Sequence, residues 1–282
     1  MGDLFNLILV HPIINILVAV YKLIFFLHIP YSLGFAIIAL TVIIRFAMYP
    51  LTAAQLKSSK KMQSLNPHLS RIKEKHKGDA KMVQSETMRL YKEHGVNPAA
   101  GCLPVIIQLP IIWALYSVLQ KIVALNPKDV VSEINKLVYF DFTKLDHAWD
   151  PSFFGLPLGQ NPSHAISSIG PLVLLLPFAT GFFQFIQSKM MISKPEEQKN
   201  LVKKDEKSAK DRSASGGKNE DFASAFQAQS LYIFPFMIGF FSFNFPIGLS
   251  LYWITFTIFG IIQQYKISGL GGLKGWVNKI HG

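Results

Sequence analysis

The feature that most constrains this chain is a series of apolar stretches, each long enough to cross a lipid bilayer as a helix. A spanning helix needs about 20 mostly apolar residues. Stretches of about this length occur at Tyr31–Leu51, Ala99–Gln120, Ile166–Gln187, Ala228–Phe245 and Gly248–Tyr265. They predict an all-α, polytopic membrane protein with five transmembrane helices.

The composition agrees with a lipid environment. Hydrophobic residues make up 50% of the chain and charged residues only 16%, whereas soluble domains carry about 25% charged residues. The net charge of +11 is also found in nucleic-acid-binding domains, but apolar runs of this length are foreign to soluble basic domains. We therefore expect no specific nucleic-acid partner. The single cysteine, Cys102, excludes an internal disulfide and is interpreted as a packing residue.

The distribution of basic residues predicts the orientation of the spans. Residues 52–98 carry far more Lys and Arg than Asp and Glu, residues 188–227 are again rich in Lys, and the tail, 266–282, has Lys but no acid. Residues 121–165 carry a balance of both signs. The positive-inside rule places the first three segments in the cytoplasm. Residues 121–165 and the N-terminus then lie outside.

Residues 1–30 form a further apolar segment. His11, Asn15 and Lys22 have spacings of four and seven and so share one face of a helix. The segment lacks the basic start of a signal peptide. We interpret it as an interfacial helix on the extracytoplasmic surface; the alternative is a sixth span.

The two long cytoplasmic segments differ in character. Within residues 52–98, apolar residues recur at helical intervals over Thr52–Lys77 and Lys81–His94, with a break at Gly78 and Asp79, which predicts a helical hairpin. Within residues 188–227, Ser193–Glu220 consists mainly of Lys, Glu, Ser and Gly. Such a composition predicts disorder.

Arg45 is the most informative single residue. It lies about six residues above the cytoplasmic end of the first span, which places it about 9 Å into the bilayer. A charged residue at mid-membrane costs about 2.5–3.5 kcal/mol, and none of the five spans contains Asp or Glu. Thr41 and Thr52 share the helical face of Arg45. We predict an unpaired cation in a cavity open to water; snorkelling to the headgroups is the alternative.

Other polar residues in the spans point to binding rather than catalysis. Gln108, Gln184 and Gln187 are candidates for a neutral polar lining, or for hydrogen bonds between helices. The histidines are scattered, and no Walker-type loop, HExxH or GxSxG motif is present. We therefore expect no catalytic residues, no metal and no cofactor, and the chain is not predicted to be an enzyme.

Several ordered motifs resemble those of one known family. They are Val42–Gln55 around Arg45, Leu90–Pro98, Gly101–Pro104, Gln108–Tyr116, Pro246–Trp253 and Ile261–Gln264. Together they resemble the bacterial YidC family, which has mitochondrial Oxa and chloroplast Albino relatives.

The resemblance implies a five-helix core around a hydrophilic groove that is open to the cytoplasm and to lipid. Arg45 matches the groove arginine, Gln187 its polar partner and Trp253 an aromatic groove residue. With Thr41 and Gln108 these form the expected substrate groove. The second and fourth spans resemble a greasy slide for nascent helices, and the cytoplasmic hairpin resembles a docking element.

The implied function is that of a membrane protein insertase and chaperone of the bacterial plasma membrane. It would act independently of the Sec translocon or together with it. The implied partners are nascent membrane proteins, membrane lipids, the ribosome, the signal recognition particle pathway and the Sec translocon. The main alternative is a small-anion transporter or channel that uses Arg45, although no internal repeat supports it. An assembly chaperone without insertase activity is a second alternative.

The sequence departs from the family pattern in three respects. It lacks the large extracytoplasmic domain of many Gram-negative members and the lipoprotein cysteine of many Gram-positive members. Its tail is also short, with few basic residues. We therefore expect a bacterial type without the large domain, and weak ribosome binding by the tail.

Overall fold

The computed structural model describes residues 2–97, 103–120, 127–191 and 222–280. Helices account for nearly all of the regular structure there. The only strands in these ranges are β1 (Ser152–Phe153) and β2 (Leu156–Pro157), which form one short antiparallel pair. The predicted all-α class is thus confirmed. The segment expected to be disordered, 193–220, and Cys102 lie outside the described residues.

The chain divides into two units. Unit 1 comprises Met1–Tyr49, Val105–Phe185 and Ile233–Gly260, and unit 2 comprises Pro50–Pro104, Ile186–Tyr232 and Ile261–Gly282. Each unit therefore gathers segments that are far apart in the sequence.

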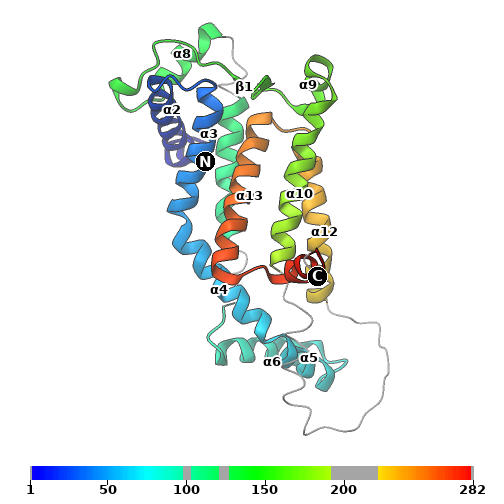
Figure 1. Ribbon diagram of the computed structural model, residues 1–282. Coiled ribbons are helices and arrows are strands. Elements are labelled where there is room, and N and C mark those ends of the chain that lie inside the picture. The colour runs from blue at the N-terminus through cyan, green and yellow to red at the C-terminus, as the bar shows by residue number, and fades with distance from the viewer. Residues whose placement is uncertain (1, 98–102, 121–126, 192–221, 281–282) are drawn as a thin grey trace. The chain divides into compact units, whose positions relative to one another are not determined.

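The N-terminal helices of unit 1 form an antiparallel pair. A first turn, α1 (Gly2–Phe5), and a π-helical turn (Asn6–Val10) lead into α2 (His11–Phe26), which packs along α3 (Ser32–Ala47) (Figure 1). Apolar residues at intervals of three and four place one buried stripe on each helix. The fully buried members are Ile14, Leu17, Val18, Leu33, Ile37 and Leu40. This contact fixes α2 against the helix that carries Arg45.

The remaining apolar helices are α7 (Leu103–Val118), α10 (Leu175–Met190), α12 (Phe222–Ser242) and α13 (Ile247–Ser268). Within unit 1, α13 contacts several of the others. A Cβ on Gly248 would lie 3.4 Å from Ile37 of α3, Tyr252 accepts a hydrogen bond from Gln108 of α7, and Ser250 is bonded to Ser242 of α12 at 2.7 Å. The last helix therefore links the others.

Helices α10 and α12 cross at a pair of glycines. A Cβ on Gly181 would lie 3.2 Å from the backbone oxygen of Pro235, and a Cβ on Gly239 would lie 3.3 Å from the backbone oxygen of Pro177. Small residues allow the backbones of membrane helices to approach closely. The two glycines thus set the distance between α10 and α12.

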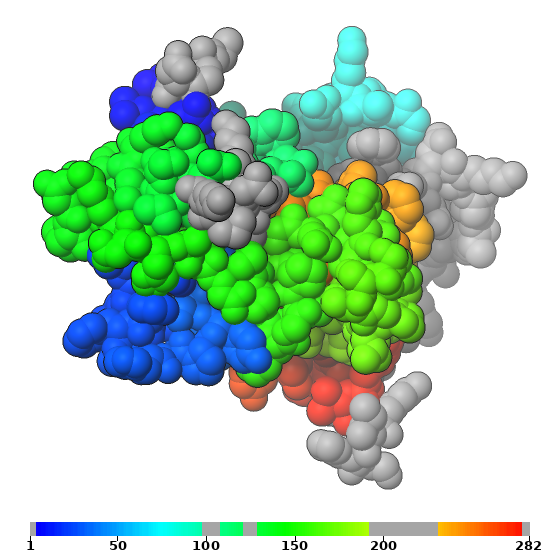
Figure 2. Space-filling model, turned by 90° about the horizontal axis from the view of Figure 1, so that it is seen from above, coloured from blue at the N-terminus to red at the C-terminus, as the bar shows by residue number. Residues whose placement is uncertain are grey.

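One end of unit 1 carries a folded segment, residues 127–169, which we call the cap. It contains α8 (Pro127–Asn135), a 3-10 turn (Asp141–Thr143), β1, β2 and α9 (Pro162–Ile169). It contributes Ile134, Leu145, Trp149 and Leu158 to the core of the unit. Seen from above, the green cap lies beside the blue residues of α2 and α3 (Figure 2). Most of the predicted extracytoplasmic loop, 121–165, is therefore ordered structure.

Unit 2 contains the predicted cytoplasmic hairpin. Helix α4 (Tyr49–Ser64) is followed by α5 (Asn66–Lys75) and α6 (Ala80–Glu93). Gly78 turns the chain between α5 and α6 with φ of +95°, and the Asp79 side chain caps α6 by accepting from the Met82 N–H at 3.0 Å. Neither α5 nor α6 buries any residue. On α6, Met82 and Met88 are each 42% exposed.

The C-terminal part of unit 2 folds back through a 3-10 turn (Gly271–Leu273) into α14 (Lys274–Ile280). There the Lys189 ammonium lies 3.0 Å from the centroid of the Trp276 ring. In the same unit, Gln263 of α13 donates to Thr52 of α4. These contacts tie the ends of α4, α10 and α13 into one cluster.

Three helical stretches in the described ranges are long and apolar enough to cross a membrane: Asn6–Phe26, Pro171–Met190 and Ile247–Ser268. A fourth arises if α3 and α4 form one broken span, and Gln108–Val118 and Leu231–Ser242 are shorter apolar helices. The chain is therefore a membrane protein with several apolar helices. The count of five spans, and the surface position of residues 1–30, stay predictions.

Candidate functional site around Arg45

The Arg45 side chain is buried inside unit 1. The residue is only 4% exposed, and its Cζ lies 3.3 Å from the centroid of the Phe256 ring. Its Nη2 donates a hydrogen bond to the backbone oxygen of Phe256. An arginine over an aromatic face is stabilised by about 0.5–2 kcal/mol, more when water is excluded. The cation is thus held by a ring and a carbonyl of α13.

No acidic side chain is available to Arg45 from the apolar helices. Helices α3, α7, α10, α12 and α13 contain no Asp or Glu. The Nε of Arg45 is buried and has no hydrogen-bond partner among the described residues. The guanidinium therefore keeps a donor that no described residue uses.

A polar and aromatic row extends from Phe256 along α13. The rings of Phe256 and Tyr252 stack with centroids 5.6 Å apart, and the Tyr252 hydroxyl accepts from Gln108 Nε2 of α7. Tyr252 is completely buried. The structure thus connects the candidates Arg45 and Gln108 through two residues of α13.

Trp253 has a different partner. Its Nε1 donates to Oε1 of Gln184 on α10 at 3.2 Å. Gln184 therefore makes a hydrogen bond between helices, the alternative that its sequence position left open. Gln187, which the family resemblance paired with Arg45, lies on the part of α10 that belongs to unit 2.

Thr41 lies one turn before Arg45 on α3. It is completely buried, and its hydroxyl donates to the backbone oxygen of Ile37 at 2.6 Å. This bond within the helix satisfies the hydroxyl proton. Thr41 and Arg45 lie on the same face of α3, as their spacing of four residues predicted.

Two important residues, Phe256 and Tyr252, were not among the sequence candidates. Tyr252 lies in the recognised motif Pro246–Trp253, so the motif itself was a signal for it. Phe256 follows by one helical turn and had no signal of its own, since an aromatic residue in an apolar span is ordinary. In the described part of the chain, no three His, Cys, Asp or Glu residues are grouped to hold a metal ion.

Comparison with known proteins places the chain in a family. Residues 24–270 match the family model described as 60Kd inner membrane protein. The chain is 33% identical over 240 residues to membrane protein insertase YidC 2 of Bacillus anthracis, covering 84% of this chain and 72% of that protein. It is 31% identical over 241 residues to the insertase YidC of Fusobacterium nucleatum, covering 85% of this chain and 88% of that protein.

A chloroplast relative and a solved structure extend the comparison. The chain is 33% identical over 269 residues to Albino3-like protein 1 of Arabidopsis thaliana, covering 89% of this chain but only 46% of that protein. A crystal structure of an active YidC insertase matches with 26% identity and a TM-score of 0.48, covering 88% of this chain and 45% of that one. The family model and the bacterial relatives decide the assignment: this chain belongs to the 60Kd inner membrane protein family, the family of the YidC and Albino3 proteins.

Proposed function

We propose that this chain is a membrane protein insertase and that nascent membrane proteins are its substrates. The observation that carries the proposal is the buried guanidinium of Arg45, held by Phe256 among helices without a single carboxylate. A protein that keeps such a cation inside a membrane uses it, since charged residues in spans are costly and mark functional sites. The proposed activity needs no cofactor and no catalytic residue.

The proposed role of Arg45 is to hold an acidic segment of the substrate for a short time. The planar guanidinium presents several N–H donors and matches a carboxylate in geometry. Two unit charges 4 Å apart attract by about 4 kcal/mol at an effective dielectric constant near 20. The membrane potential then favours outward movement of the negative segment by about 2.3 kcal/mol per 100 mV. The apolar part of the substrate partitions into lipid.

A buried polar oxygen on α13 supports a hydrated groove in unit 1. Thr257 Oγ1, next to Phe256 in the chain, is buried and lacks a hydrogen-bond partner in the described ranges. An unsatisfied buried polar group costs about 1–3 kcal/mol, so this hydroxyl favours contact with water. We infer that Thr257 lies at the lining of the groove.

Contacts of α2 support the surface position of the N-terminal segment. Asn15 donates to Leu137 O at 2.9 Å and accepts from Tyr139 N at 2.7 Å, and Lys22 donates to Lys144 O at 2.7 Å. The stretch from Asn15 to Lys22, roughly 10 Å of helix, is thus bound to residues 137–144 of the cap.

The finer parts of the proposal follow from topology and charge. We place the chain in a bacterial plasma membrane with its N-terminus and cap outside and its C-terminus in the cytoplasm. The α5–α6 hairpin, which buries none of its residues, is the proposed docking element. The ribosome, the signal recognition particle pathway and the Sec translocon are its candidate partners.

Reconstitution tests the proposal directly. The purified chain is placed in proteoliposomes with a single-span substrate whose translocated tail is acidic, and protection of that tail from added protease is measured. We expect protection with the chain and little in empty liposomes. Efflux of a small anion from the same vesicles is measured in parallel. Anion efflux without tail protection would replace the insertase proposal with the transporter alternative.

A further inference from the structure

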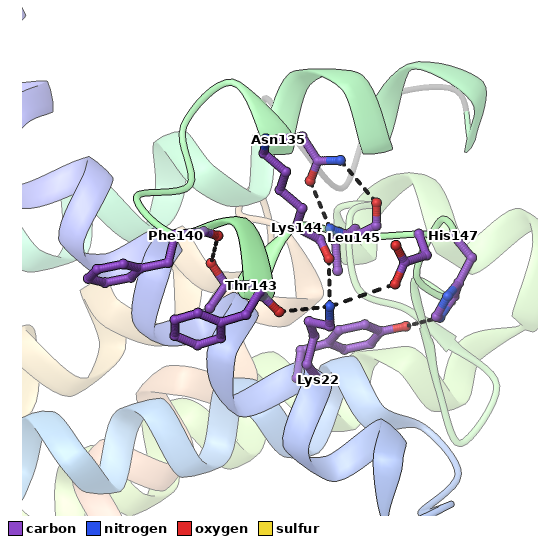
Figure 3. A network of polar contacts seen from close by, with 10 residues as sticks. Lys22, Asn135, Phe140, Thr143, Lys144, Leu145 and His147 are labelled. Carbon is purple, nitrogen blue, oxygen red and sulfur yellow. Dashed lines mark hydrogen bonds and ion pairs between the residues drawn. The ribbon is translucent and has the colours of Figure 1, made fainter.

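The cap carries a cluster of exposed aromatic side chains at residues 139–143, which we call the aromatic turn. Tyr139, Phe140 and Phe142 are 51%, 58% and 74% exposed. The rings of Phe140 and Phe142 stack, with centroids 5.4 Å apart and planes inclined by 22°. The ring of Phe140 projects away from the polar network beside it (Figure 3). Large apolar side chains gathered in this way on a surface indicate an interaction site.

The backbone of the aromatic turn is held by hydrogen bonds from Thr143 and from two residues of α2. Thr143 is buried, and its backbone N–H and its hydroxyl both donate to Phe140 O, at 3.0 and 2.7 Å. From α2, Lys22 Nζ donates to Phe142 O at 3.0 Å (Figure 3). Asn15 accepts from the N–H of Tyr139. Two residues of α2 thus hold the turn, Asn15 at Tyr139 and Lys22 at Phe142.

Exposed apolar side chains also occur on α2, close in sequence to the residue that holds the turn. Lys22, which binds the backbone of Phe142, is followed on α2 by Leu23 and Phe26, which are 60% and 76% exposed, and then by Leu27, which is 58% exposed. Exposed apolar side chains gathered in this way are suited to contact lipid. Unit 1 thus offers apolar surface on α2 as well as on the aromatic turn.

The lysines around the turn are engaged with acidic side chains. Lys22 lies 3.7 Å from Asp146, Lys136 2.5 Å from Glu133 and Lys144 2.6 Å from Asp141. The hydrogen bond from Lys144 holds the pKa of Asp141 below its usual value, so this carboxylate stays charged and paired at neutral pH. Paired charges attract anionic headgroups weakly. The rings, rather than the lysines, are the part suited to bind lipid.

We propose that the aromatic turn inserts into the bilayer leaflet that faces the cap, with its rings at the boundary between headgroups and acyl chains. Tyrosine is enriched at this depth because its ring is apolar and its hydroxyl is polar, and phenylalanine rings supply the apolar side of segments that lie at the interface. The occupant of the surface is phospholipid, zwitterionic or anionic alike. Since α2 holds the turn, the insertion also fixes α2 and the cap at the level of the interface. The proposal does not depend on insertase activity.

Spin labels measure the depth of the turn. In a Cys102→Ser background, Phe142→Cys and, separately, Phe140→Cys carry the label. The matched control is Ser132→Cys on α8, another exposed position of the cap. In nanodiscs of phosphatidylcholine alone, we expect labels at 140 and 142 to be relaxed strongly by oxygen and several-fold less by a water-soluble nickel chelate. The label at 132 should show the opposite pattern.

The choice of lipid and membrane separates the alternatives. Replacing part of the phosphatidylcholine with phosphatidylglycerol should leave the depth at 142 unchanged. If the label at 142 enters the bilayer only when phosphatidylglycerol is present, the lysines bind the cap to the membrane. If the labels at 132 and 142 are equally accessible to the nickel chelate, the turn stays in water. Protection of 142 in native membranes but not in nanodiscs would identify a protein partner. Each of these three results overturns the proposal.

Discussion

The guanidinium of Arg45 lies face-on to the ring of Phe256, 3.3 Å from its centroid, and also donates to the backbone oxygen of the same residue. One residue of α13 therefore provides both a π-face and a carbonyl to the only charged side chain of α3. This arrangement keeps the cation in the apolar interior without a carboxylate. In the proposed function, the partners among the described residues with which a substrate carboxylate competes are this ring and this carbonyl.

The role of Arg45 is tested by substitution. Arg45→Ala should lower insertion of a substrate with an acidic tail about tenfold, which corresponds to about 1.4 kcal/mol, and Arg45→Lys should largely preserve it. The reason is Coulomb attraction, which a lysine also provides. Protease protection of the tail in proteoliposomes gives the yield, with a neutral-tailed substrate as control. Equal yields for Arg45→Ala and the natural chain would show that the charge is not used.

The contact between Arg45 and Phe256 is tested by a double-mutant cycle. Phe256→Leu removes the π-face but keeps an apolar side chain and the backbone carbonyl, and should destabilise the protein by about 0.5–2 kcal/mol. In an Arg45→Ala background the same substitution should cost much less, because the cation is gone. Unfolding in detergent micelles, followed by circular dichroism, measures both. Identical losses in the two backgrounds would mean that Phe256 stabilises by packing alone.

The glycine crossing of α10 and α12 gives a prediction about stability. Gly239→Val places a Cβ 3.3 Å from Pro177 O and adds two methyl groups beyond it, so overpacking should cost about 1–3 kcal/mol. Gly275→Ala on α14, where a Cβ meets nothing within 4 Å, is the matched control and should be neutral. The apparent unfolding temperature of each variant measures the change in stability. An unchanged temperature for Gly239→Val would mean that α10 and α12 separate easily.

The topology is tested by cysteines placed one at a time in a Cys102→Ser background. Cysteines at Gly2 and Asp146 should react with an impermeant thiol reagent from outside, whereas those at Lys75 and Lys279 should react only after the membrane is opened. The basis is the positive-inside rule and the binding of α2 to the cap. Labelling at Gly2 only from inside would make Asn6–Phe26 a sixth span.

The two segments predicted to be cytoplasmic are tested by deletion. Removing residues 60–92, which include most of the α5–α6 hairpin, should abolish insertion in cells while the spans still integrate. Removing residues 199–218 should be nearly neutral, because that composition has too little apolar surface to bury. Growth of a strain that depends on the chain measures both deletions. The opposite pattern would assign docking to the other segment.

Several features of the fold were predictable from local sequence. The long apolar stretches predicted a helical membrane protein, because bilayer thickness sets the length of a spanning helix and the backbone must bond internally in lipid. The helix predicted over Lys81–His94 corresponds to α6 after the break at Gly78, whereas the helix predicted over Thr52–Lys77 is divided into α4 and α5 at Leu65. The motif around Arg45 indicated the family, and the comparisons confirmed it.

Tertiary structure decided what the polar residues contact. Asn15 and Lys22 lie on one face of α2 by their spacing alone, but only the fold brought residues 137–146 against that face. Likewise Arg45 was recognisable from its position in an apolar span, whereas its partner Phe256 lies on the last helix, 211 residues away. Helical periodicity fixes which residues share a face because it depends on neighbours in the chain. Contacts between distant segments depend on how those faces pack, which no local pattern specifies.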